Sequence, residues 1–134
     1  MNQENMDLIY TAHSKHLFYF TRHISKFVLE QGVVPLNPFM IWDYFLSDTV
    51  DRDLVREGNN NLVRRADGIW IFGPVSDGVL NEIRIARETW KPIKFFEVVK
   101  SREIREIQPY QAVFEDGLER FRGELYSNLK NGND

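Results

Sequence analysis

One carboxylate interrupts an apolar helical stripe in the segment FGPVSDGVLNEIRIA, residues 72–86. Val79, Ile83 and Ala86 recur at the spacing of one helix face, and Glu82 falls among them. From the pattern alone, the commoner arrangement is a glutamate at the edge of the stripe that reaches solvent or pairs with a neighbouring arginine. The alternative is a partly buried carboxylate with a chemical role.

The residues around Glu82 favour the chemical alternative. Ser76 is a favoured residue for capping the start of a helix, and Gly78 in the first turn allows the chain or a ligand to approach closely. The free N–H groups and the dipole of a helix start suit an anion such as phosphate. A carboxylate beside an anion site has the chemistry that a reaction at a sugar carbon requires. The competing partners for Glu82 are Arg84 and Arg87.

Asn59 is a second polar residue within an apolar pattern. It falls on the stripe formed by Val55, Leu62 and Ala66, in the run NNN. A buried asparagine must be hydrogen-bonded, because an unpaired amide costs about 1–3 kcal/mol. The partner would be protein or ligand. An equally weighted alternative is that the helix breaks after Gly58 and all three asparagines are exposed.

Histidine and cysteine patterns argue against a metal or a cofactor. The histidines are His13, His16 and His23, and no carboxylate joins them at metal-ligand spacing, so we expect exposed or capping histidines. The chain has no cysteine, which excludes disulfides, thiolate zinc sites and cysteine nucleophiles. The dinucleotide and P-loop fingerprints and the serine nucleophile elbow are missing. We therefore expect no cofactor.

Length and charge narrow the class of protein further. The 134 residues suggest a single domain over 1–134. A net charge of −3 without a basic tract makes nucleic acid an improbable partner. No apolar run reaches the length of a membrane span, and the first residues do not have the pattern of a secretory signal. We expect a cytoplasmic protein that binds no membrane.

Alternating strand and helix patterns predict the fold. The expected strands are 7–12, 33–38, 67–73 and 91–99, with 102–107 as a short edge strand. The expected helices cover 13–32, a stretch capped by Asp48 or Thr49 and running to Ala66, a stretch from Ser76, and a last one from Pro109 that carries Phe114, Leu118, Phe121 and Leu125. Residues 39–48 fit either a short helix or a lid loop, and the last five residues are expected to fray.

This order of elements predicts an α/β protein of the flavodoxin or Rossmann-like type. We expect three layers, α/β/α, around a mostly parallel sheet of four to five strands. Ligands of such sheets bind beyond the carboxyl ends of the strands. The loops after Tyr10, Leu36 and Gly73 are therefore expected to form the site.

Four motifs in this order resemble a known family. They are YTAHS (10–14), RRADGIWIF (64–72), SDGVLNEIRIA (76–86) and KPIKFF (91–96). Together they look like the nucleoside 2-deoxyribosyltransferases, and most closely like their relatives the 2′-deoxynucleoside 5′-phosphate N-hydrolases. The third motif has the form S-x-G-V-x-x-E-x-x-x-A and is moderately specific. The resemblance covers roughly residues 8–98.

The resemblance implies a role for each matching residue. Glu82 falls on the catalytic nucleophile of the family, which attacks the anomeric carbon and forms a glycosyl-enzyme ester. Tyr10 matches the tyrosine that helps to place the sugar and the nucleophile. Ser76 stands where the transferases carry an acidic residue for a free 5′-hydroxyl and where the hydrolases carry serine for a phosphate. Ser14 matches a second phosphate-binding serine, and the Gly78 N–H would assist.

Two residues depart from the family pattern, and a third has an unfavourable charge. Asn59 stands at the position of an aspartate that donates a proton to the leaving base, which an amide cannot do in the same way. His13 replaces a small residue in the first loop. Asp77 would be unfavourable beside a phosphate unless it points to solvent. The aromatic residues Phe39, Trp42, Tyr44 and Phe45 could stack on the base, or could equally belong to the core or to a dimer seam.

Three functions remain open at this stage. The first is hydrolysis of the N-glycosidic bond of a deoxynucleoside 5′-monophosphate. The second is deoxyribosyl transfer on free nucleosides, and the third is a binding protein that keeps the pocket without the chemistry. Ser76 favours the first over the second, and Asn59 is the best argument for the third. The resemblance also implies a homodimer or higher homo-oligomer. It leaves the preferred base undetermined.

Overall fold

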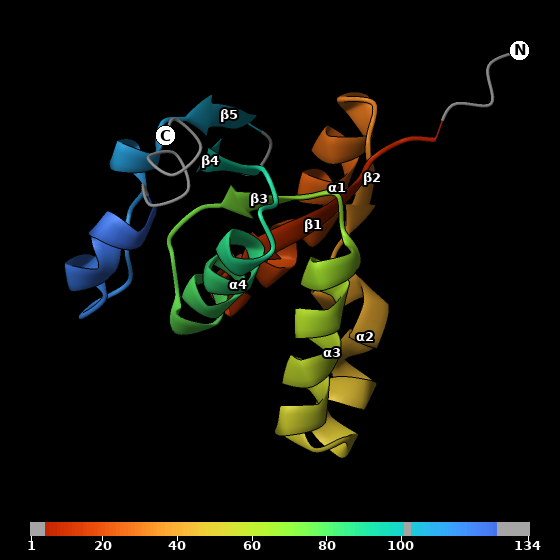
Figure 1. Cartoon of the computed structure of the whole chain (residues 1–134). Helices are drawn as coiled ribbons and strands as arrows, with labels where there is room; N and C mark the ends of the chain where they lie inside the picture. Colours follow the sequence, from red (N-terminus) through yellow and green to blue (C-terminus); the bar gives the residue numbers. More distant parts are fainter. Residues whose placement is uncertain (1–4, 101–102, 126–134) are drawn as a thin grey trace, which may run out of the picture.

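The chain forms an α/β structure around one five-stranded sheet (Figure 1). The computed structural model of the protein describes residues 5–100 and 103–125, and of residues 43–48 it describes the backbone alone. The strands are β1 Leu8–His13, β2 Val34–Leu36, β3 Gly68–Phe72, β4 Ile93–Lys100 and β5 Glu103–Ile107. Their order is β2-β1-β3-β4-β5. The four strands β1 to β4 are parallel, and β5 pairs antiparallel with β4.

The mostly parallel sheet of the expected class is thus present, compatible with a Rossmann-like fold. The expected edge strand in 102–107 is confirmed as β5. Proline at position 35 fits β2 because that strand lies at the other edge, where one N–H needs no ladder partner. β1 and β3 lie in the centre and are almost fully buried, as their unbroken apolar runs predict.

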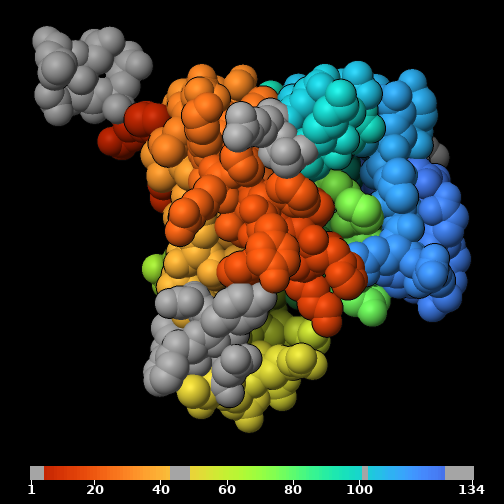
Figure 2. Space-filling model, turned by 180° about the vertical axis from the view of Figure 1, so that it is seen from behind, coloured from red at the N-terminus to blue at the C-terminus, as the bar shows by residue number. Residues whose placement is uncertain are grey.

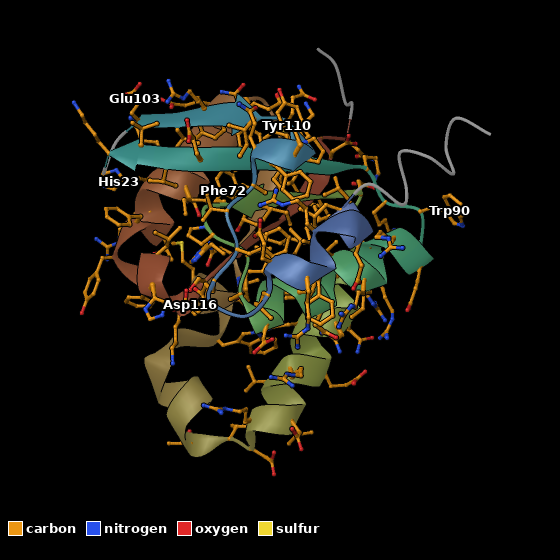
Figure 3. All side chains as sticks on the ribbon, turned by 90° about the vertical axis from the view of Figure 1, so that its left-hand side faces the viewer. His23, Phe72, Trp90, Glu103, Tyr110 and Asp116 are labelled. Atoms are coloured by element: carbon orange, nitrogen blue, oxygen red, sulfur yellow. The ribbon has the colours of Figure 1, made fainter. Side chains whose placement is uncertain are left out.

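Alternate residues of β1 and β3 enter two separate core clusters. Tyr10 and Ile71 pack in one cluster with residues of α3 Arg52–Arg65 and α4 Asp77–Glu88. Ile9 and Phe72 pack in the other with residues of α1 Thr21–Glu30. Figure 2 shows the N-terminal third of the chain covering the middle of one face of the molecule. Phe72 points into the interior, whereas Trp90, Glu103 and Tyr110 lie on the outside (Figure 3).

The stretch 13–32 does not form one continuous helix. Lys15–Phe20 is a 3₁₀ helix, η1, and the α-helix begins only at Thr21. The N–H of Leu17 donates to the carbonyl of Ser14, three residues earlier. The Leu17 side chain fills the space beside Gly73, where a Cβ atom would lie 2.6 Å from its Cδ1. A tight turn that docks Leu17 on the end of β3 therefore replaces the expected first turns of α-helix.

Two long helices follow β2 and form a hairpin. The ambiguous stretch 39–48 lies in a helix, α2 Pro38–Thr49, whose start is capped by Asn37. We expected Asp48 or Thr49 to cap α3, but both residues belong to α2. The cap of α3 is Asp51, whose side chain accepts a hydrogen bond from the N–H of Asp53 at 2.8 Å. The α2–α3 hairpin extends away from the sheet (Figures 1 and 3).

The predicted last helix is wrong. Pro109–Gln111 and Glu119–Leu125 form two short 3₁₀ helices, η2 and η3, and the chain between them contains a turn at residues 116–117. Phe114 forms an isolated bridge with Val75, and Gly117 adopts a positive φ of 83° that no α-helix accommodates. The apolar residues of this segment belong to a loop that packs on the core and passes beside the start of α4 (Figure 3). The tail 130–134 lies outside the described residues.

Candidate functional site

A cavity of about 480 Å³ opens at the carboxyl ends of β1 and β3. Its size lies within the range of about 300–1,000 Å³ that is typical of small-molecule sites. Two groups of residues face each other across it. The sheet-side wall consists of His13, Ser14, Ser76, Gly78 and Glu82, and the hairpin wall consists of Trp42, Arg52, Val55, Arg56 and Asn59.

Glu82 lies on the inner face of α4 and is only 9% exposed. The Tyr10 hydroxyl donates a short hydrogen bond to Glu82 Oε2. The expectation from periodicity alone, a solvent-exposed glutamate or one paired with Arg84 or Arg87, is therefore wrong. Arg84 donates hydrogen bonds to Glu124 instead, and Arg87 forms an ion pair with the same carboxylate. Glu82 is shielded from solvent because the apolar residues on either side of it pack α4 against the sheet.

Burial raises the pKa of Glu82 from 4.5 to about 7. The hydrogen bond from Tyr10 and the positive charge of Arg56 act in the opposite direction and limit the rise of this pKa. Burial also raises the pKa of Tyr10 well above 10, and the Glu82 charge adds to that rise. Near neutral pH the carboxylate and its protonated form are thus both populated, with a tyrosine fixed as donor to one oxygen.

Both predicted phosphate-binding serines lie at the starts of helical segments. Ser14 caps η1, its Oγ accepting from the N–H of His16 at 3.2 Å. Ser76 caps α4 as predicted, its Oγ accepting from the N–H of Val79 at 3.3 Å. An accepting hydroxyl keeps its own hydrogen for another partner. Both serines can therefore donate into the cavity.

Gly78 provides open space rather than a close chain contact. A Cβ atom at this position would meet no heavy atom within 4 Å. Packing of the described chain therefore does not require a glycine here. The free space belongs to the cavity, beside the N-terminal N–H groups of α4.

His13 is buried and hydrogen-bonded, contrary to the expectation of an exposed or capping histidine. Its Nδ1 lies 2.9 Å from the carbonyl of Ser14, and its Nε2 lies 3.1 Å from Asn37 Nδ2. These contacts fit a neutral ring that donates from Nδ1 and accepts at Nε2. Burial lowers the pKa of His13, which also favours the neutral ring. Its ring stacks on Phe39, with centroids 4.7 Å apart.

Asn59 lines the cavity and belongs to an unbroken helix. The expected alternative, a break after Gly58, is not observed, since α3 runs from Arg52 to Arg65. The Trp42 Nε1–H donates to Asn59 Oδ1 at 2.6 Å, so the two predicted residues contact each other. The side chains of Tyr44 and Phe45 lie outside the described part of the structure.

The structure adds residues that sequence reasoning did not single out. Arg52 and Arg56 face the cavity from α3, and Lys15 and His16 from η1. Glu115 reaches it from the C-terminal loop, which bonds to Val75 through both backbone partners. The periodicity of α3 could have indicated Arg52 and Arg56, because they flank Val55 on the stripe that carries Asn59. Nothing in the pattern indicated Glu115, which is placed by a long-range contact.

The described ranges contain neither a metal-binding cluster nor a membrane-spanning helix. Within 5–100 and 103–125, no three His, Asp or Glu side chains cluster closely enough to hold a metal ion. No helix in the same ranges has the length and apolar character of a membrane span.

The sequence can also be compared with known proteins. No curated protein matches the chain. Residues 9–96 match a family model described as a domain of unknown function (DUF7768). The matched range contains all eight predicted site residues and excludes Glu115. Because the match covers more than half of the 134 residues, the chain belongs to the DUF7768 family.

Proposed function

We propose that the protein hydrolyses the N-glycosidic bond of a 2′-deoxynucleoside 5′-monophosphate. The observation that carries this proposal is the buried Glu82 at the cavity, hydrogen-bonded to Tyr10. The motif resemblance to the 2′-deoxynucleoside 5′-phosphate N-hydrolases supports the same reaction. It also supports a three-layer, flavodoxin-like arrangement, for which the two core clusters are further support.

The proposed reaction has two steps. Glu82 attacks the anomeric carbon with the oxygen that Tyr10 does not bind, the C–N bond breaks, and the base leaves with the bonding electrons. This gives a glycosyl-enzyme ester, as in retaining glycosidases. Water then attacks the anomeric carbon, its oxygen bonds to that carbon as the bond to Glu82 breaks, and Glu82 is released as the carboxylate. The attacking water loses one proton to solvent, and the departed base takes up one proton from solvent. A pKa near 7 gives a substantial ionised fraction at neutral pH.

The phosphate of the substrate would lie between the two capping serines. Ser14 and Ser76 each keep a hydroxyl hydrogen to donate, and the start of α4 adds backbone N–H groups at Gly78. Lys15 lines the same cavity and adds a positive charge. Asp77 interacts electrostatically with Arg84, which partly compensates its charge beside the phosphate position.

Glu115 supports a second candidate, deoxyribosyl transfer on free nucleosides. Its carboxylate lines the cavity together with Ser76. A carboxylate there would accept a hydrogen bond from a free 5′-hydroxyl and would repel a phosphate. A binding protein without activity is the third candidate, because Asn59 cannot donate a proton as an acid would. The proposal also includes homo-oligomer formation, which the resemblance implies, and a cytoplasmic location, which is the expectation from the sequence patterns.

Base release distinguishes the candidates. The wild type, Glu82→Ala and Glu88→Ala are incubated with the four deoxynucleoside monophosphates and with the four nucleosides. Glu88 is the matched control, since it is exposed on the same helix. We expect base release from a monophosphate by the wild type and by Glu88→Ala, and none by Glu82→Ala. Rapid quenching and mass spectrometry should detect a deoxyribose phosphate ester on the Glu82 peptide.

The other outcomes point elsewhere. Release from nucleosides alone would support the transferase, and a second base added to the reaction would then be incorporated. In that case Glu115→Gln should weaken nucleoside binding and strengthen monophosphate binding. Ligand binding without release of any base would contradict both enzymatic proposals.

A further inference from the structure

The contact between Trp42 and Asn59 fixes the orientation of the Asn59 amide. An indole N–H is only a donor, so the atom 2.6 Å from it must be the amide oxygen. The Nδ2 group consequently lies on the other side of the amide. An asparagine whose amide could rotate would offer either a donor or an acceptor to a ligand. The amide of Asn59 is held by Trp42 and offers only its Nδ2 donor.

Gly58 makes the contact sterically possible. A Cβ atom at Gly58 would lie 2.8 Å from Trp42 Cζ2 and 3.2 Å from its Cη2. The indole therefore packs directly on the backbone of α3 at this position. This close approach brings Nε1 within reach of Asn59, one residue further along the helix.

The Nδ2 group of Asn59 is free and accessible. Among the residues that the structure describes, no hydrogen-bond partner is found for it, while Oδ1 is occupied by Trp42. Within the same residues, the only buried side-chain N or O atom without a partner is Arg87 Nε. An unpaired Nδ2 must therefore be exposed, and Asn59 and Trp42 both line the cavity. A residue that lines the cavity therefore carries an amide group whose N–H donors are unused among the described residues.

We propose that Asn59 determines base specificity by selecting bases whose facing edge carries an exocyclic oxygen. The inference rests on the proposed function, because it takes the ligand to be a nucleotide. A carbonyl oxygen accepts from Nδ2, whereas an amino group would place donor against donor. The same N–H groups stabilise the negative charge that develops on the departing base. Asn59 thus acts by donating a hydrogen bond in place of a proton.

Binding measurements in an inactive background test this inference apart from catalysis. In Glu82→Gln, titration calorimetry compares two ligand pairs, deoxyuridine with deoxycytidine monophosphate and deoxyinosine with deoxyadenosine monophosphate. Each pair exchanges a carbonyl for an amino group on an otherwise similar ring. We expect the carbonyl-bearing member to bind about tenfold more tightly in both pairs.

Two further variants and one control make the test specific. Asn59→Asp keeps an oxygen for Trp42 and presents an acceptor to the ligand, so the preference should reverse. Trp42→Phe keeps an aromatic ring but frees the amide to rotate, so the preference should shrink below about threefold. Asn61→Asp is the matched control, since Asn61 is exposed and bonds within its own helix to the carbonyl of Glu57. It should leave the preference unchanged.

The outcomes separate this inference from the proposed function. Equal binding within both pairs, or a preference that survives Asn59→Asp, would overturn the inference alone. The expected preference without base release by the wild type would overturn hydrolysis and leave the inference standing. Failure of all four monophosphates to bind would overturn both. Circular dichroism of each variant checks that its fold is intact.

Discussion

The two walls of the cavity are built in different ways. Three residues of the sheet-side wall, His13, Ser14 and Glu82, are buried at the edge of the core. The hairpin wall consists of exposed and half-buried side chains on α3, with Trp42 of α2 held by one hydrogen bond and a glycine contact. A change at one of these three buried residues is therefore expected to affect folding and the proposed chemistry together. A change in the hairpin wall can alter ligand choice while the core stays intact.

Among the changes in the two walls, we expect Glu82→Gln to have the largest effect on activity. Base release should fall by on the order of 10³-fold or more, because the proposed nucleophile is lost. The folded protein holds the Glu82 proton more tightly than the unfolded chain, since burial raises this pKa from 4.5 to about 7. The unfolding free energy of the wild type should therefore decrease as pH rises across this interval, by on the order of 3 kcal/mol.

This part of the pH dependence should be missing in the variant. Urea denaturation of both proteins at several pH values between 4 and 8 measures the difference between the two curves. Wild-type activity should follow the opposite course and increase with pH up to about 7, since attack needs the ionised carboxylate. Parallel stability curves would show that Glu82 does not titrate in the folded protein as described.

Tyr10→Phe should produce the next largest effect. Its hydroxyl lowers the pKa of Glu82, so removal should move the rise of activity to higher pH. At pH 7 we expect base release to fall about 10- to 100-fold and stability to fall by about 1–3 kcal/mol, because a buried acceptor loses its donor. Tyr110→Phe is the matched control on an exposed tyrosine. An unchanged pH profile of activity would mean that Tyr10 only supports the fold.

Gly78→Ala should separate binding from stability within the sheet-side wall. The added methyl group meets no protein atom within 4 Å, and alanine is the better helix former by about 1 kcal/mol. Thermal stability should stay the same or rise. Monophosphate affinity should fall about tenfold, because the methyl group enters the proposed phosphate position. An unchanged affinity, measured by calorimetry, would place the phosphate elsewhere.

Gly58→Ala is the corresponding change on the hairpin wall and should have the smallest effect. Helix propensity favours alanine, while the clash with the Trp42 indole opposes it, so net stability should change by less than about 1 kcal/mol. The displaced indole would release Asn59, and the carbonyl-over-amino preference should fall to about threefold. Retention of the full preference would show that the amide is held by something other than Trp42.

Local sequence patterns predicted the elements that place the sheet-side wall. The apolar runs of β1 and β3 and the cap at Ser76 are confirmed, because strand burial and helix capping depend on neighbouring residues. Periodicity placed Glu82 on the apolar stripe but did not reveal its hydrogen-bond partner, since Tyr10 is 72 residues away in the sequence. The same holds for His13, whose partner Asn37 belongs to the next strand-to-helix loop.

The errors at the other elements have a common cause. The helical spacing of three apolar residues was misleading, namely that of Leu17, Phe114 and Leu118. Each of them packs against a segment that is distant in the sequence, and the chain around them is not α-helical. The hairpin could be recognised only in part, because residues 39–48 combine helix and loop signals. The catalytic roles themselves come from motif resemblance, and the experiments above are their test.

Asn37 connects the two walls by hydrogen bonds at one end of the cavity. Its Oδ1 accepts from the N–H groups of Phe39 and Met40 at the start of α2, and its Nδ2 contacts His13 Nε2 at the end of β1. Separating the walls here would uncap a helix and leave a buried ring nitrogen unpaired, each at a cost of about 1 kcal/mol or more. The base of the hairpin is therefore fixed to the sheet at this point, whereas the turn at Val50 and Asp51 lies at the opposite end of the hairpin, away from the sheet (Figure 1).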